Sequence, residues 1–236
     1  MSFKECIRRR ITVDPELSKI HSLLLFGSYV RGDFVPGLSD LDILMIVGDE
    51  APDMDHLREI IGSCVEGVGH KLLDLPWERL ENLRDPMNMG YGFKFLTIYL
   101  RDFLENHEVV YGDEIAHILP RYDTDTLIKW RTKRLSISGE LIKDRPEMAP
   151  VVAGEVCRLM AMISGAEGIS KQVVLDALKA VGDEQATDIY ESYVKKRKPD
   201  KGHEYYIEFI ESRIRKIESN LGSQQKVSET AGASTF

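Results

Sequence analysis

Two apolar runs separated by a segment rich in turn-forming residues constrain the fold of this chain more than any other feature. Residues 22–26 (SLLLF) and 41–47 (LDILMIV) are short and strongly apolar, a pattern that predicts buried strands. The segment between them, GSYVRGDFVPGLSD, contains the glycines and the proline that interrupt regular structure. The first half of the chain is therefore expected to build its core around a sheet.

The rest of the first half alternates between helical and strand patterns. The amphipathic spacing of residues 53–66 predicts a helix that ends at Gly67 and Gly69. The other predicted elements are a short helix over 14–20, a third strand in HKLLDLPW that ends at Pro76, a helix over 90–105 and a short strand in HEVVYGDEI.

The second half shows only helical periodicity, which predicts a bundle. The expected helices cover 125–143, 150–165, 171–181, 184–197 and 203–221. We therefore predict an α+β protein with a first domain of strands and helices over 1–119 and an all-α domain over 120–222. The small polar residues of 223–236 predict a disordered tail.

Charge and cysteine content narrow the function class and the environment. The formal net charge of −8 disfavours a broad nucleic-acid surface, which normally carries a basic stripe. The three cysteines are far apart and fit neither a disulfide framework nor a zinc site, which predicts a reducing compartment. No apolar run approaches the length of a membrane span. We expect a soluble, cytoplasmic protein that contacts no membrane.

Two carboxylates follow the segment that separates the first two strands. Asp40 and Asp42 are two residues apart, and strand side chains alternate faces with period two, so both point the same way. Such a pair repels itself unless a cation lies between its members, and oxygen ligands of this kind suit Mg²⁺. A solvated strand end is the alternative interpretation of the pair taken alone.

A possible phosphate-binding turn precedes this pair. Gly27 and Ser28 end the first predicted strand, and Arg31-Gly32 follows shortly afterwards. Glycine allows close backbone approach, exposed N–H groups and a hydroxyl can hold phosphate oxygens, and arginine adds a bidentate cation. A phosphate cradle opposite a metal-binding acid pair suits phosphoryl or nucleotidyl transfer.

Residues 26–47 resemble the signature of the DNA polymerase β-type nucleotidyltransferase superfamily, G-S-x-x-R-G followed by S-D-x-D and an apolar strand. The resemblance implies transfer of a nucleoside monophosphate from an NTP such as ATP, assisted by two Mg²⁺ ions, with pyrophosphate leaving. The matching positions are Gly27, Ser28, Arg31, Gly32, Ser39, Asp40 and Asp42. The resemblance assigns all of them except Gly32 to the catalytic, metal-binding or nucleotide-binding site.

The family also uses a third carboxylate on a later strand. Asp74, an acid within the apolar run HKLLDLPW, is the best candidate for this metal ligand and general base. An exposed acid at a strand end is the alternative interpretation. Glu66 and Asp85 are weaker candidates because one ends a helix and the other lies in a polar loop.

A fainter similarity extends into the second half. The segment EVCRLMAMISGAEGISKQVVLDAL is similar to the helical domain of the aminoglycoside adenylyltransferases that act on streptomycin and spectinomycin. The resemblance assigns Arg158 and Lys171 to the triphosphate, and Ser170 is a good helix cap. Arg158 lies off the apolar stripe of its predicted helix, which would leave it open to the nucleotide. The acidic and aromatic residues with which those adenylyltransferases bind the aminoglycoside have no match in this chain.

The sequence therefore predicts an enzyme that transfers AMP from ATP to a hydroxyl of a small-molecule acceptor, which is cationic if the cleft is acidic. Three alternatives remain open: an antitoxin-type enzyme that adenylylates a protein, a non-catalytic NTP-binding module, and a polynucleotide-tailing enzyme, which the charge of −8 disfavours.

Overall fold

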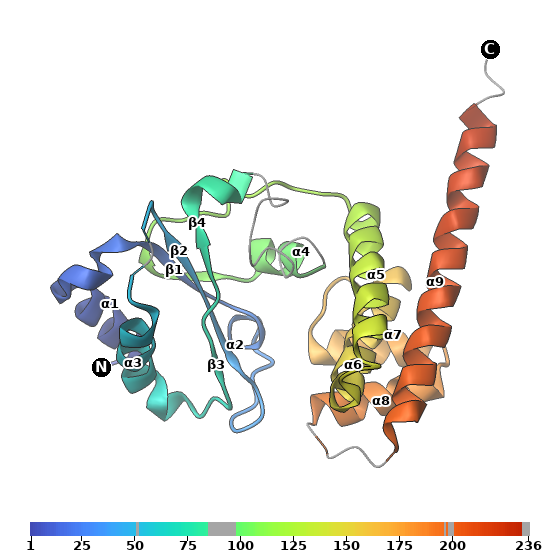
Figure 1. The fold of residues 1–236 in the computed structure, drawn as a ribbon, viewed down its shortest axis with the longest axis horizontal. Coiled ribbons are helices and arrows are strands. Elements are labelled where there is room, and N and C mark those ends of the chain that lie inside the picture. Colours follow the sequence, from blue (N-terminus) through green and yellow to red (C-terminus); the bar gives the residue numbers. More distant parts are fainter. Residues whose placement is uncertain (51, 85–97, 196, 198–200, 233–236) are drawn as a thin grey trace. The chain divides into compact units, whose positions relative to one another are not determined.

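The chain forms two compact units, Met1–Tyr122 and Asp123–Phe236 (Figure 1). The computed structural model describes residues 1–50, 52–84, 98–195, 197 and 201–232. The sequence predicted a division at 119/120, and the units divide at 122/123. The predicted α+β class is confirmed, because a mixed sheet with flanking helices is followed by a helical unit.

The sheet of the first unit is built around its two most apolar strands. β1 pairs antiparallel with both β2 and β5, whereas β2 runs parallel to β3 and β4 on its other side. The strand order is β3-β2-β1-β5, and β4 also pairs with β2. The strands are β1 (Ile20–Phe26), β2 (Leu41–Val47), β3 (Leu73–Asp74), β4 (Trp77–Arg79) and β5 (Glu108–Gly112).

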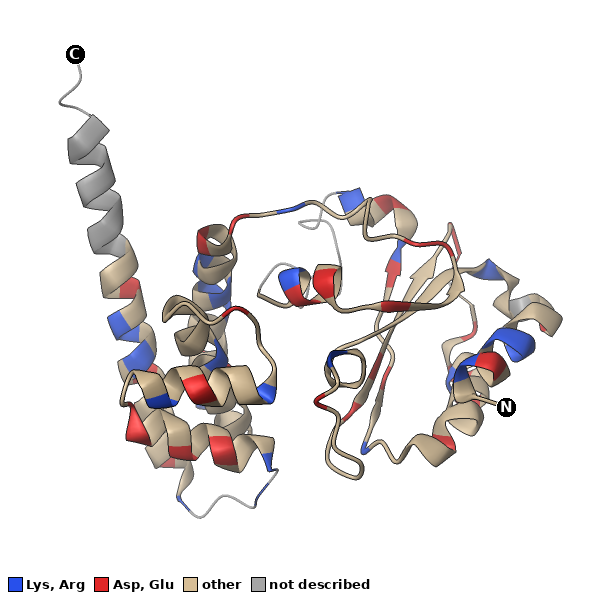
Figure 2. Cartoon of the chain, turned by 180° about the vertical axis from the view of Figure 1, so that it is seen from behind, with Lys and Arg blue, Asp and Glu red and all other residues tan. Residues whose placement is uncertain are grey.

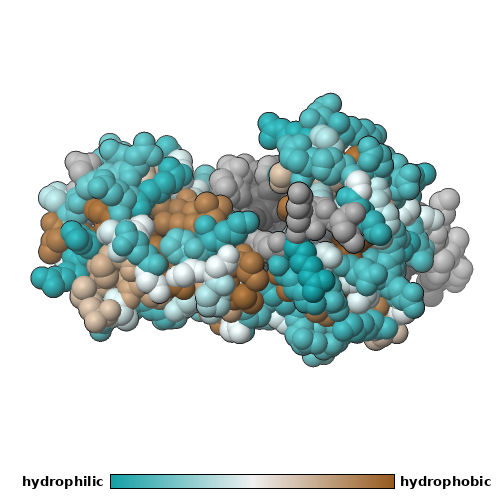
Figure 3. Space-filling model, turned by 90° about the horizontal axis from the view of Figure 1, so that it is seen from below, coloured by the Kyte–Doolittle hydropathy of each residue, from teal (hydrophilic) through white to brown (hydrophobic). Residues whose placement is uncertain are grey.

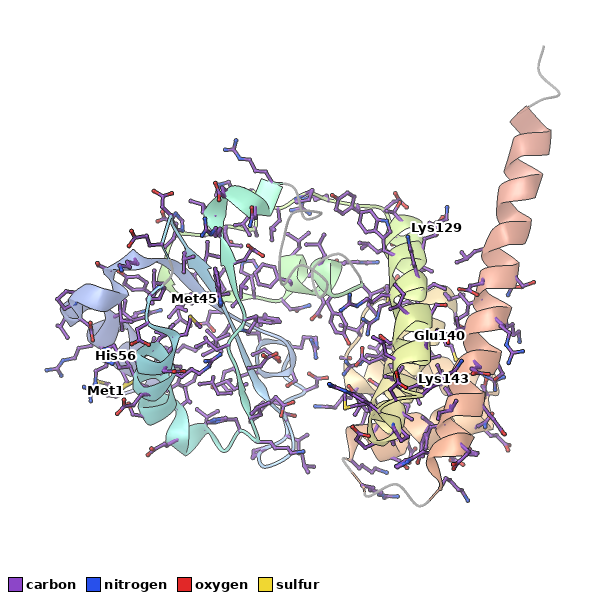
Figure 4. The ribbon with its side chains drawn as sticks, in the orientation of Figure 1. Met1, Met45, His56, Lys129, Glu140 and Lys143 are labelled. Carbon is purple, nitrogen blue, oxygen red and sulfur yellow. A yellow bond between two sulfur atoms is a disulfide. The ribbon has the colours of Figure 1, made fainter. Side chains whose placement is uncertain are left out.

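The two faces of β2 have different roles. Its odd-numbered side chains, among them Met45, pack in a core with α1 (Phe3–Val13) and α3 (Met54–Val65). Met45 on the sheet and His56 on α3 are labelled in Figure 4. Because side chains alternate along a strand, Asp42 belongs to the opposite face. This core therefore supports β2 from one side, and the opposite face, which is buried at Leu44 and Ile46, carries the half-buried Asp42 near the start of the strand.

Helices of different lengths complete the first unit. Asp53 is the N-cap of α3, and its carboxylate accepts hydrogen bonds from the backbone N–H groups of Asp55 and His56. This is ordinary N-capping, and it fixes where the helix starts. The remaining helical segments are η1 (Pro15–Lys19), α2 (Ser28–Arg31), η2 (Glu66–Val68), η3 (Leu80–Arg84) and α4 (Ile98–Glu105).

Three local predictions need correction or fall outside the description. Helix α1 was missed because charged residues dominate its sequence, although Ser2 and Glu5 form a capping box. The third strand continues beyond its predicted end as β4, because Pro76 cannot donate a ladder hydrogen bond but its carbonyl still accepts one from Met45 N at 2.9 Å. Of the helix predicted over 90–105, residues 90–97 lie outside the described residues.

The expectation that the cysteines form no disulfide is wrong. Cys6 on α1 and Cys64 on α3 are bonded, with a Cα–Cα distance of 5.7 Å, and Cys157 is free and buried. A separation of 58 residues gave no sequence signal, since the two cysteines meet only because α1 and α3 pack together. The inference of a reducing compartment, which depended on unpaired cysteines, therefore loses its support.

The second unit is a bundle of helices around one apolar core. Its helical segments are α5 (Thr124–Leu141), η5 (Pro146–Met148), α6 (Ala149–Ile163), α7 (Lys171–Ala180), α8 (Glu184–Val194) and α9 (His203–Gly232). The expected disordered tail is corrected over most of its length, because α9 continues to Gly232. Residues 222–232 contain no proline and several good helix formers, so the helix can propagate once its earlier turns are packed.

The surface is mixed in character. In Figure 2, Lys and Arg are interspersed with Asp and Glu along the helices of both units. The face drawn in Figure 3 is mostly hydrophilic with scattered apolar patches. Within the described part of the chain, no helix combines the length and the apolar character that crossing a membrane requires.

Loss of the disulfide is expected to destabilise the first unit. Because the bond closes a loop of 58 residues, reduction or Cys6→Ser should lower the free energy of unfolding by about 2–4 kcal/mol. Urea unfolding with and without a thiol reductant measures the effect. In Cys6→Ser the reductant should have no further effect. A reductant effect of equal size in that variant would contradict the assignment.

Candidate active site

The two predicted strand acids lie side by side on adjacent strands. Asp42 of β2 is the register partner of Asp74 of β3, and the two strands run parallel. Side chains at paired positions of neighbouring strands project from the same face of the sheet. Asp40 precedes β2 by one residue and shares the parity of Asp42, and all three side chains are half-buried. The structure thus brings Asp42 and Asp74 together on one face of the sheet.

The Gly27–Ser28 turn packs directly against this edge. Gly27 has φ +71°, and a Cβ atom added to it would lie 2.2 Å from Asp42 Oδ2. A side chain at this position would force the Asp42 carboxylate to move, and the positive φ also disfavours any residue other than glycine. Phe26, the residue before the turn, is the register partner of Asp42 in β1. The close approach of this backbone to a carboxylate is therefore built into the sheet.

Beyond the turn the chain forms the single helical turn α2. The N–H of Arg31 donates to the Gly27 carbonyl and the N–H of Asp33 donates to the Ser28 carbonyl, both at 3.1 Å. Gly32 adopts a left-handed conformation, with φ +83°, and ends the helix. The side chain of Ser28 is buried. One helical turn is too short to persist alone, so contacts with the rest of the unit must hold it.

Ser39 has a visible structural task. Its hydroxyl accepts a hydrogen bond from Val35 N at 2.9 Å, and its carbonyl accepts one from Lys71 N at 2.9 Å. These bonds close the loop before Asp40 and connect it to the chain leading into β3. Ser39 thus shapes the loop that leads to Asp40, and its predicted contact with the nucleotide stays a prediction.

Arg31 also differs from its prediction. Its Nη1 atom donates to Asp102 Oδ2 on α4 at 2.5 Å, and its Nε atom lies 3.4 Å from Asp33 Oδ1. The side chains of Arg31 and Asp102 are only 9% and 7% exposed. The guanidinium is thus engaged by carboxylates of the same unit, where the sequence predicted a phosphate-binding cation. Asp102 was missed because it lies 71 residues away, with no motif around it.

The donor set can be compared with what a magnesium ion needs. Among the residues that the structure describes, no group of three His, Cys, Asp or Glu side chains comes close enough to hold a metal. Mg²⁺ commonly takes only one or two protein carboxylates and completes its shell with water and substrate phosphates. Asp42 and Asp74 fit that smaller requirement. Glu66 and Asp85 were the less favoured candidates for the third carboxylate. Glu66 is the C-cap of α3, and Asp85 lies outside the described residues.

In the second unit, Arg158 lies in a polar cluster on α6. Its Nη1 donates to Glu155 Oε1 at 2.9 Å, its Nε donates to the Tyr190 hydroxyl at 3.2 Å, and its guanidinium lies 5.3 Å from the ring centre of Tyr193. Glu155 also pairs with Arg131 and accepts the Tyr193 hydroxyl at 2.8 Å. Burial raises the pKa of the Tyr190 hydroxyl, which keeps it a neutral partner.

This cluster changes the expected role of Arg158. The sequence predicted a side chain open to the nucleotide, but Arg158 is only 12% exposed. Two guanidiniums share the single carboxylate of Glu155, so the three groups together carry net positive charge. Gly154 makes the arrangement possible, because a Cβ there would lie 2.3 Å from Tyr193 Cγ. The tyrosine partners, distant in sequence, gave no signal.

Lys171 occupies the predicted start of α7. Ser170 is the N-cap, and its hydroxyl accepts a hydrogen bond from Val173 N at 3.4 Å. The preceding helix α6 ends at Ile163 with Ser164 as its C-cap, and the next residue, Gly165, has φ +91°. A hydrogen bond from Ala166 N to the Ala161 carbonyl completes that termination. Gly165 therefore helps to terminate α6, and Ser170 caps the start of α7.

Comparison with known proteins agrees with the first unit's geometry. Residues 10–89 match the model of the nucleotidyltransferase domain family. No curated protein matches the chain. Among solved structures, the fold is similar to a spectinomycin adenyltransferase, AAD(9) from Enterococcus faecialis, solved with ATP and spectinomycin, with TM-score 0.59 and 15% identity over 90% of this chain and 96% of that one. A toxin–antitoxin structure with AMP-PNP matches with TM-score 0.29 and 17% identity over 55% of this chain and 83% of that one.

These findings concern the first unit above all. Its acids paired across two strands and the glycine turn against one of them agree with the match of residues 10–89 to the nucleotidyltransferase domain. The fold of the chain is similar to that of the spectinomycin adenyltransferase.

Replacement of Gly27 tests the importance of the close approach. Gly27→Ala should lower turnover by about 10²-fold, because displacement of a positioned group by about 1 Å has this effect. It should also destabilise the protein by more than Gly32→Ala, which meets nothing within 4 Å and bears only the cost of a positive φ. Thermal melting and nucleotide turnover of both variants measure this. Equal behaviour of the two variants would contradict the proposed packing.

Proposed function

We propose that this nucleotidyltransferase transfers AMP from ATP to a hydroxyl group of a small-molecule acceptor, with Mg²⁺ assisting and pyrophosphate leaving. The observation that carries the proposal is the pairing of Asp42 with Asp74 beside a turn whose glycine backbone lies against the Asp42 carboxylate. ATP is favoured by the fold similarity to an adenyltransferase solved with that nucleotide.

Asp42 and Asp74, with Asp40 beside them, are the residues that would hold magnesium. When bound, the ion supplies neutralisation of phosphate charge and a template for in-line displacement. Two carboxylates on one face of the sheet suit a bound Mg²⁺ ion, because without a cation between them the two negative groups would repel each other. This assignment also explains why acids lie half-buried at the end of an apolar strand.

The chain's own groups would perform three tasks. The backbone of Gly27 and Ser28 would bind phosphate oxygens, since glycine lets that backbone approach a ligand closely. Asp74 would accept the proton of the attacking hydroxyl, a role that requires only hydrogen-bond reach of the acceptor oxygen. The rigid sheet would orient both groups for in-line attack at the α-phosphorus. Positioning and charge stabilisation would supply most of the rate enhancement.

Arg158 and Lys171 are proposed as further cations for the triphosphate. The two guanidiniums gathered around Glu155 support this role, as does the position of Lys171 in the first turn of α7. Glu155 and Tyr193 would then keep the Arg158 side chain in one orientation, which reduces the entropy lost when an anion binds.

A screen for pyrophosphate release is the first experiment. ATP and Mg²⁺ are incubated with the protein and with aminoglycosides, other small alcohols or candidate proteins as acceptors. Release that depends on a small alcohol supports the proposal. Release that requires a protein acceptor would replace it with the antitoxin-type activity, and ATP binding without release would make the chain a regulatory module.

Removal of single carboxylates tests the proposed chemistry. Asp42→Asn and Asp74→Asn should each reduce Mg²⁺-dependent pyrophosphate release by at least about 10²-fold, because each variant loses a negative charge that would bind the metal ion. Circular dichroism and thermal melting should show an intact fold. Asp55→Asn is the matched control, since that side chain is 97% exposed and lies on α3. Full activity in both site variants would remove the mechanism.

A further inference from the structure

We infer that Arg31 and Asp102 form a buried ionic tether that positions the Gly27–Ser28 turn, so that Arg31 is a positioning residue and not a phosphate ligand. The inference concerns a pair of side chains on α2 and α4. The distance from Arg31 Nη1 to Asp102 Oδ2 is 2.5 Å, and both side chains are more than nine-tenths buried. Its catalytic consequence rests on the proposed function.

Helix α4 holds the turn on both of its sides. Before the turn, the ring of Phe26 packs edge-on against Phe103 of α4 at a centroid distance of 5.8 Å. After the turn, Arg31 reaches the neighbouring residue Asp102. Two successive residues of one helix therefore fix the entry and the exit of a turn whose backbone lies against Asp42.

The charges of the pair are already committed to one another. Asp102 also accepts a hydrogen bond from Asn106 Nδ2 at 3.3 Å, and Asp33 Oδ1 lies 3.4 Å from Arg31 Nε. A guanidinium enclosed by two carboxylates would have to lose buried partners before it could contact a triphosphate. Breaking a buried pair leaves an uncompensated charge, which is strongly unfavourable. The geometry thus favours a fixed support for α2.

The support has a clear purpose because α2 has only four residues. A single helical turn has an unfavourable nucleus and needs tertiary contacts to remain formed. Among the other side chains of α2, Val30 packs against the apolar core, and the ring of Tyr29 lies 5.5 Å from that of Phe3 and 5.4 Å from that of Phe34. Ring packing allows sliding, whereas a short ion pair fixes direction as well as distance.

The decisive variant is Asp102→Asn, which leaves Arg31 in place. If the tether positions the turn, Asp102→Asn and Arg31→Lys should both raise KM for ATP and lower kcat/KM by about 10–100-fold. The double variant Arg31→Met/Asp102→Leu replaces the pair with apolar groups, so it should melt near the wild-type temperature and keep the kinetic defect. Glu105→Gln is the control, because it breaks only the exposed Arg101–Glu105 pair of the same helix.

Hydrogen exchange gives a second readout that needs no activity. The amides of Arg31 and Asp33 report on the turn through their bonds to Gly27 and Ser28. They should exchange at least about tenfold faster in Asp102→Asn, while amides of β1 and β2 keep their wild-type rates. Unchanged exchange of these two amides would overturn the inference.

The same variants separate the tether from direct phosphate binding. If Arg31 were a phosphate ligand, Asp102→Asn would leave the affinity for ATP unchanged or would increase it, and only the Arg31 variants would lose it. That result would also overturn the inference.

Failure of the proposed function can be told apart from failure of the tether. If the wild-type protein binds ATP but releases no pyrophosphate with any acceptor, the proposed function fails. The exchange and affinity measurements would still decide whether the tether exists.

Discussion

The close approach of the Gly27 backbone to the Asp42 carboxylate is the constraint on which the site depends. It requires a residue without a Cβ atom and a positive φ, and it requires that β1 end where β2 begins. The antiparallel pairing of these strands meets the second requirement by making Phe26 the neighbour of Asp42. The parallel pairing of β2 with β3 then adds Asp74 to the same face.

The apolar core between the sheet and the helices α1 and α3 serves this arrangement by packing against the face of β2 opposite to Asp42. Residues of α1 and α3 pack against the odd-numbered side chains of β2, and a disulfide joins the two helices. The acids can therefore lie at the end of a buried strand without being enclosed by apolar groups. Burying a carboxylate within that core would be strongly unfavourable, so the separation of the two faces is a condition for the site.

Charged side chains in both units have structural partners that reduce their freedom. Arg31 lies between Asp102 and Asp33, and Arg158 lies between Glu155 and two tyrosines. The two arrangements differ. Arg31 pairs with two carboxylates, whereas the carboxylate of Glu155 pairs with two guanidiniums, those of Arg131 and Arg158.

The sequence alone determined the elements and acids that have a local signal. Apolar runs predicted β1 and β2, helical spacing predicted α3 and the bundle, and the spacing of Gly27, Ser28, Asp40 and Asp42 predicted the kind of site. Only the tertiary structure decided that Asp74 is the neighbour of Asp42, that Cys6 meets Cys64 and that Arg31 faces Asp102. Each of these joins residues far apart in the chain, and no local periodicity records which strand or helix will pack beside another.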